Sequence, residues 1–76
     1  MGIIDQIKIT IETAIPGAEA QVGGGGGHFD ITVTSEAFAG LKLLDRQRLV
    51  YVAIGELMQG ADAPLHAVDR LVCRTP

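Results

Sequence analysis

The sequence has few residues that cross-link a protein or anchor it in a membrane. Its 76 residues include one cysteine, no tryptophan and only 4% aromatic residues. The lone Cys73 excludes a disulfide within the chain and is typical of a reducing compartment. Charges interrupt every apolar stretch well before the ~18 residues of a membrane span, and the N-terminus shows no targeting signal. We therefore predict a cytoplasmic protein without membrane contact.

Positive charge is also scarce. Six Lys and Arg against nine Asp and Glu give a net charge of -3 with neutral histidines. This balance excludes nucleic-acid binding driven by overall charge, which requires a basic surface. Lys42, Arg46 and Arg48 still form a local basic cluster. Such a cluster is either a solvated face or a contact for phosphate or an acidic partner.

The sequence is rich in apolar residues that can form a core. Hydrophobic residues make up 47% of it, which predicts one globular domain over residues 1–76. A domain of this length has a thin stability margin, so a metal, a partner or a second copy would support it. Alone, we expect a monomer or a weak homodimer.

The first half of the chain predicts a helix followed by a hairpin. Residues 2–14 fit a helical face better than an alternating strand, and only Ile9 lies off phase. Residues 19–22 and 28–34 predict two strands, the second with clean apolar alternation. Between them lie five consecutive glycines, for which we expect a long flexible tip.

The second half predicts two helices and a last strand. Ser35 is positioned to cap a short helix that runs through Ala39. Asp45 is positioned to cap a stronger helix, whose apolar stripe comprises Leu49, Val50, Ala53, Ile54, Leu57 and Met58. Residues 66–74 predict a strand whose alternation slips around residues 69–71, which indicates a β-bulge.

This order predicts an α+β fold of αββααβ topology, a three-stranded mixed sheet with helices packed on one face. The last strand follows a helical crossover and is expected to run parallel to the second strand. His28 and His66, which open these two strands, should therefore lie near each other beside the glycine run.

The glycine run does not match a nucleotide-binding loop. A Walker loop requires Gly-Lys followed by Ser or Thr, whereas His28 follows Gly27 here. Two interpretations remain: a mobile hairpin tip, or a bare backbone that lets a partner approach closely. The residues concerned are Gly23, Gly24, Gly25, Gly26 and Gly27.

Candidate metal ligands are limited to His28, His66 and Cys73. The paired ligand spacings of a zinc site are missing, and Cys73 is interpreted as a small core residue. Each histidine is either an ordinary surface residue or, with the other, part of a shared metal site. Ser35 is explained as a helix cap, so no nucleophile and base form a catalytic unit, and we predict that the chain is not an enzyme.

Several motifs, in order along the chain, together resemble the BolA family. They are Ile15-Pro16-Gly17-Ala18, His28-Phe29, Ser35-Glu36-Ala37-Phe38-Ala39-Gly40, Leu44-Asp45-Arg46-Gln47-Arg48-Leu49-Val50-Tyr51 and His66-Ala67. The resemblance implies a class II KH-like form of the αββααβ fold. It also implies a non-enzymatic partner of monothiol glutaredoxins that shares a [2Fe-2S] cluster in iron-sulfur trafficking or iron sensing.

The same resemblance implies how the ligands are divided. His66 matches the C-terminal histidine of the family, and His28 is the residue left for the second ligand, which relatives carry in the first hairpin loop. The partner's thiolate and glutathione supply the remaining ligands, so the isolated chain is expected to bind no cluster. Two alternatives stay open: a nucleic-acid-binding transcriptional regulator that uses Lys42, Arg46 and Arg48, and a metal-free interaction module.

Overall fold

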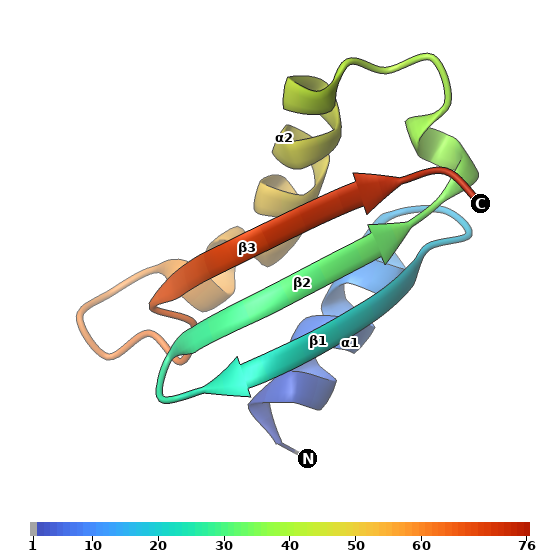
Figure 1. Ribbon diagram of the computed structural model, residues 1–76. Coiled ribbons are helices and arrows are strands. Elements are labelled where there is room, and N and C mark those ends of the chain that lie inside the picture. The colour runs from blue at the N-terminus through green and yellow to red at the C-terminus, as the bar shows by residue number, and fades with distance from the viewer. Residues whose placement is uncertain (1) are drawn as a thin grey trace.

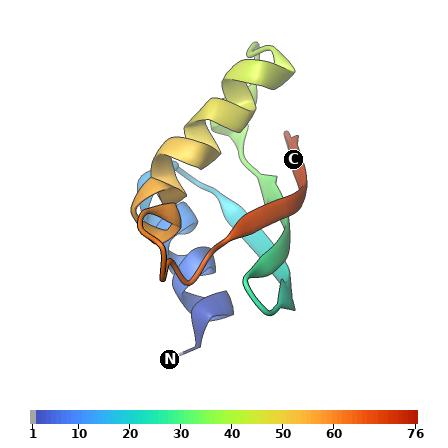
Figure 2. The same ribbon diagram turned by 90° about the vertical axis from the view of Figure 1, so that its left-hand side faces the viewer.

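A computed structural model describes residues 2–76 and contains one sheet packed against helices. Helix α1 (Ile3–Ala14) leads into strands β1 (Glu19–Gly25) and β2 (His28–Thr34), and the 3-10 helix η1 (Glu36–Phe38) follows. Helix α2 (Leu43–Ile54) continues into the 3-10 helix η2 (Gly55–Met58), and strand β3 (Ala67–Arg74) ends the fold. Figure 1 shows this order, and Figure 2 shows both α-helices on one side of the sheet.

The sheet has the order β1-β2-β3, so β2 is its centre. Strand β1 runs antiparallel to β2, and β3 runs parallel to β2 with one irregularity beside Phe29 and Asp30. This confirms the predicted α+β class, the mixed sheet, the parallel last strand and the bulge. The KH-like comparison stays a prediction.

The core lies between the sheet and the helices because apolar residues alternate along the central strand. Phe29, Ile31 and Val33 are buried, whereas His28 and Asp30 are exposed on the opposite face. Helix α1 contributes Ile7 and Ile11, α2 contributes Val50 and Ile54, and the loop before β3 contributes Leu65. Ile9 is 47% exposed, as expected of the one isoleucine off the helical phase.

The glycine run differs from the prediction of a long flexible tip. Strand β1 continues through Gly25, which pairs with His28, so only Gly26 and Gly27 form the turn. Both have positive φ, 63° and 84°, as a type I′ hairpin turn requires. Glycine keeps its backbone donor and acceptor, so Gly23, Gly24 and Gly25 can extend the ladder.

The helices in the second half of the chain also differ in detail from the sequence prediction. Ser35 Oγ accepts a hydrogen bond from the Ala37 amide as predicted, but the segment that it caps is a 3-10 helix. Asp45 is not the cap of α2: the helix begins at Leu43, and Asp45 lies in its first turn, where a negative charge is favourable. The α-helical part ends at Ile54, before Gly55, a poor helix former. Leu49 is 40% exposed and is not part of the buried stripe.

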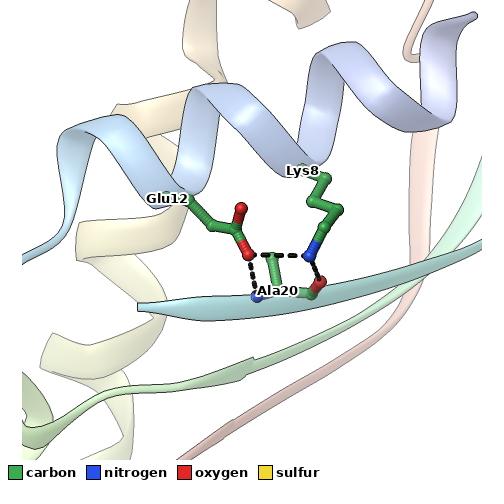
Figure 3. Close-up of polar contacts among 3 residues, drawn as sticks. All are labelled: Lys8, Glu12 and Ala20. Atoms are coloured by element: carbon green, nitrogen blue, oxygen red, sulfur yellow. Dashed lines mark hydrogen bonds and ion pairs between the residues drawn. The ribbon is translucent and has the colours of Figure 1, made fainter. Parts of the chain in front are cut away.

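The free edge of β1 is partly closed by α1. Lys8 Nζ donates to the Ala20 carbonyl at 2.9 Å, and the Ala20 amide donates to Glu12 Oε2 at 3.0 Å (Figure 3). Lys8 and Glu12 also pair with each other at 2.8 Å. These side chains occupy backbone groups that an added strand would otherwise use. The hydrogen bond from Lys8, followed by that from Ala20, lowers the pKa of Glu12.

Candidate metal-binding end of the sheet

One end of the sheet gathers the two histidines and the hairpin turn. The turn joins β1 to β2, and β3 begins at the same end because it runs parallel to β2 (Figure 1). His28 is the first residue of β2 and pairs with Ala67, while His66 directly precedes β3. The structure thus places both histidines at one end, as the sequence predicts.

Backbone hydrogen bonds connect the two histidine-bearing segments through Gly27. The Gly27 carbonyl accepts from the His66 amide at 2.8 Å and from the Ala67 amide at 2.9 Å. Leu65, fully buried, anchors the approach to β3, and its amide donates to the Leu57 carbonyl at 3.1 Å. The backbone at His66 is therefore held firmly, while its side chain is exposed.

The His66 side chain lies close against the turn at Gly27. A Cβ added to Gly27 would lie 3.0 Å from Cδ2 and 3.1 Å from Cβ of His66. Gly27 therefore serves two requirements: a positive φ and a close approach of the His66 side chain. The sequence predicts a permissive role for all five glycines and does not distinguish Gly27 from the others.

His28 has a partner that the sequence analysis missed. Its Nδ1 lies 3.1 Å from Oδ1 of Asp69, and both side chains are more than half exposed. The only signal in the sequence was the slipped alternation around residue 69, which predicted the bulge but not what the extra residue would contact. The contact leaves Nε2 as the ring nitrogen available to another ligand or metal.

The histidine end alone does not form a complete metal site. Within residues 2–76, no group of three or more His, Cys, Asp or Glu side chains is placed to hold a metal ion. Cys73 lies toward the other end of β3, is buried, and pairs in register with Val33. Burial raises the pKa of its thiol, which disfavours the thiolate that a metal would bind. Its prediction as a core residue is confirmed.

The predicted basic cluster does not form one open surface. Arg46 is partly buried: its Nε donates to the Leu41 carbonyl at 3.0 Å, and a guanidinium nitrogen lies 3.5 Å from the Cys73 carbonyl. Arg48 pairs with Asp45 at 3.4 Å, and Lys42 is the N-cap residue of α2. Arg46 thus helps to join α2 to β3, which leaves Lys42 and Arg48 as the exposed cations of this group.

The other end of the sheet and the helices offer no stronger candidate site among residues 2–76. A shallow hollow at the opposite end of the sheet is lined by Pro16, Gly17, Glu36, Ala37 and Pro76, which include one ionisable side chain. Among the helices of residues 2–76, none has the length and apolar composition needed to cross a membrane.

Comparison with known proteins agrees with the fold. Residues 4–76 match the family model described as BolA-like protein. A comparison with curated protein sequences gave no match.

Solved structures similar to this chain include bacterial and plant proteins. A bolA protein homologue from Coxiella burnetii is 38% identical, with a TM-score of 0.82 over 100% of this chain and 94% of that one. BolA1 from Arabidopsis thaliana is 25% identical, with a TM-score of 0.81 over 100% and 94%. The BolA domain of SufE1 from Arabidopsis thaliana is 26% identical, with a TM-score of 0.77 over 100% and 95%. The chain belongs to the BolA-like protein family.

Proposed function

We propose that this BolA-like protein is a non-enzymatic, cytoplasmic partner of a monothiol glutaredoxin, and that the two proteins share a [2Fe-2S] cluster in iron-sulfur trafficking or iron sensing. One observation carries the proposal: two exposed histidines lie at the same end of the sheet, where the Gly27 carbonyl accepts the His66 amide and His28 directly follows Gly27. Within residues 2–76, this end of the sheet provides two possible metal ligands but not a complete metal site.

The donor chemistry fits a shared cluster. A [2Fe-2S] cluster takes four ligands besides its own sulfides, and two imidazoles can replace two thiolates on one iron. His66 and His28 can supply these two imidazoles, while a thiolate of the glutaredoxin and glutathione supply the other two. Imidazole ligation raises the cluster potential relative to coordination by thiolates alone. Nothing lies within 4 Å of a Cβ on Gly26, so the tip of the turn leaves space for the partner near the histidines.

Nucleic-acid binding is the less favoured alternative. The chain carries a net charge of -3, and Arg46 is engaged by backbone carbonyls between α2 and β3. Lys42 and Arg48 would then supply few phosphate contacts, so binding to DNA should be weak and should fall steeply with salt. Sequence-selective binding at physiological salt would favour the regulator over the cluster partner.

The deciding experiment mixes the chain with apo or cluster-loaded monothiol glutaredoxin in the presence of glutathione. Light scattering coupled to size exclusion should show a one-to-one complex, and the visible spectrum of the loaded glutaredoxin should change when the complex forms. Separate monomers with both forms of the partner would contradict the proposal. A complex whose cluster spectrum does not change would instead support a metal-free interaction module.

A further inference from the structure

The bulge in β3 gives Asp69 an unusual position. Phe29 pairs with Val68, and the next residue of β2, Asp30, pairs with Arg70. Asp69 is therefore the extra residue of β3, without a register partner in β2. A bulge of this kind redirects a side chain at the edge of a sheet. Here the redirected carboxylate reaches back to the first residue of β2, His28.

The contact between Asp69 and His28 determines which ring nitrogen of His28 carries the hydrogen. An ionised carboxylate only accepts hydrogen bonds, whereas a neutral imidazole carries one N–H and one lone pair. For the 3.1 Å contact between Nδ1 and Oδ1 to be a hydrogen bond, Nδ1 must carry the hydrogen. The lone pair of neutral His28 then lies on Nε2, the nitrogen that points away from the contact.

We propose that Asp69 is a positioning residue: it holds His28 in the tautomer with hydrogen on Nδ1 and so presents Nε2 as the metal-binding atom. Histidine ligands of metal sites commonly donate their second N–H to a carboxylate, which fixes the ring and raises its basicity. The orienting role concerns the isolated chain. Its use at a cluster rests on the proposed function.

The first test measures the tautomer of His28 in the isolated chain by long-range ¹H–¹⁵N NMR at about pH 8, where an ordinary imidazole is neutral. A histidine side chain exposed to water prefers hydrogen on Nε2, so a majority of the Nδ1–H tautomer in the parent is the expected sign of Asp69. In Asp69→Ala this majority should be lost. In Asp69→Asn it should fall, because an amide donates to Nδ1 as readily as it accepts.

Asp30→Asn is the matched control, since Asp30 is exposed on the same face of the sheet and makes no hydrogen bond or ion pair with His28 in residues 2–76. It should keep the parent's tautomer ratio. Circular dichroism should give the same fold for all variants. A majority of the Nε2–H tautomer in the parent, or an unchanged ratio in Asp69→Ala, would overturn the proposal.

The second test uses the complex with cluster-loaded glutaredoxin. Loss of an outer partner of a metal ligand commonly costs about 10- to 100-fold in metal affinity, so Asp69→Ala should shorten the cluster lifetime by about tenfold, and Asp30→Asn should leave it unchanged. Equal lifetimes for Asp69→Ala and the parent would overturn the positioning role while the shared cluster stands. Failure of the parent to take up a cluster, with the expected tautomers intact, would overturn the proposed function instead.

Discussion

The His66 side chain occupies the space where a side chain at Gly27 would begin. A Cβ on Gly27 would lie 3.0 Å from Cδ2 of His66, and the Gly27 carbonyl accepts the His66 amide hydrogen at 2.8 Å. The hairpin turn thereby holds the backbone of the main candidate ligand and lies close against its side chain. This relationship makes the turn part of the candidate site.

Substituting Gly27 should therefore disturb His66, whereas substituting its neighbour should not. Gly26→Ala and Gly27→Ala both place a side chain at positive φ, at a cost of about 1–2 kcal/mol each. Only the methyl of Gly27→Ala meets the ring, because nothing lies within 4 Å of a Cβ on Gly26. NMR should show shifted His66 ring signals in Gly27→Ala alone. Equal shifts in the two variants would show that the contact does not constrain the ring.

The two histidines should contribute unequally to the shared cluster. The backbone of His66 is held through its amide and through its buried neighbour Leu65. The His28 side chain contacts the exposed carboxylate of Asp69. His66→Ala should abolish the visible circular dichroism of the mixed cluster, and His28→Ala should weaken it, since solvent or glutathione can take the vacant position. Both side chains are exposed, so far-ultraviolet circular dichroism should show intact folds. A folded His66→Ala variant with the parent's spectrum and cluster lifetime would exclude His66 as a ligand.

The sequence predicts the element order and the histidine end of the sheet because both follow from periodicity and topology. Alternation in β2 and a helical crossover before β3 suffice to bring His28 and His66 to one end. The prediction of a long flexible tip is wrong because it was based on the missing side chains of the glycines. Strand pairing depends on the backbone, which glycine retains. The contact of His28 with Asp69 requires the exact placement of the bulge, and the partial burial of Arg46 requires the packing of α2 against β3. No local sequence pattern predicts the contact of His28 with Asp69 or the position of Arg46.

The strand glycines should differ sharply in their tolerance of a side chain. A Cβ on Gly24 would lie 2.3 Å from the His28 carbonyl oxygen and 2.9 Å from Cα of Phe29, with φ at +113°. Both obstacles are backbone atoms that cannot move without breaking the pairing of β1 with β2. Gly24→Ala should therefore lower the free energy of unfolding by at least about 2 kcal/mol.

Gly23→Ala is the matched control for Gly24→Ala. A Cβ on Gly23 meets nothing within 4 Å, and its φ is not positive. Alanine in a strand interior is favoured over glycine by roughly 0.5–1 kcal/mol, so Gly23→Ala should leave stability unchanged or raise it. Urea unfolding of both variants checks the pair. Similar losses in the two would contradict the paired-strand description of the glycine run.

Acid should weaken the attachment of α1 to the edge of β1 through Glu12. Its pKa in the folded protein lies below the ordinary value of 4.5, chiefly because the carboxylate accepts a hydrogen bond from Lys8 and then one from the Ala20 amide. A carboxyl group with a lowered folded pKa stabilises the fold fully above its unfolded pKa. This contribution is lost as the pH falls through the lower, folded value.

The unfolding free energy of Glu12→Gln should therefore lie below that of the parent at neutral pH, and the gap should close as the pH falls below the ordinary glutamate value of 4.5. Glu56→Gln is the control: Glu56 is exposed, and its side chain makes no hydrogen bond or ion pair with any other residue in 2–76. Its curve should stay parallel to that of the parent. Urea unfolding at a series of pH values measures all three proteins. A constant gap between Glu12→Gln and the parent across this range would show that the carboxylate charge of Glu12 does not hold the helix to the strand.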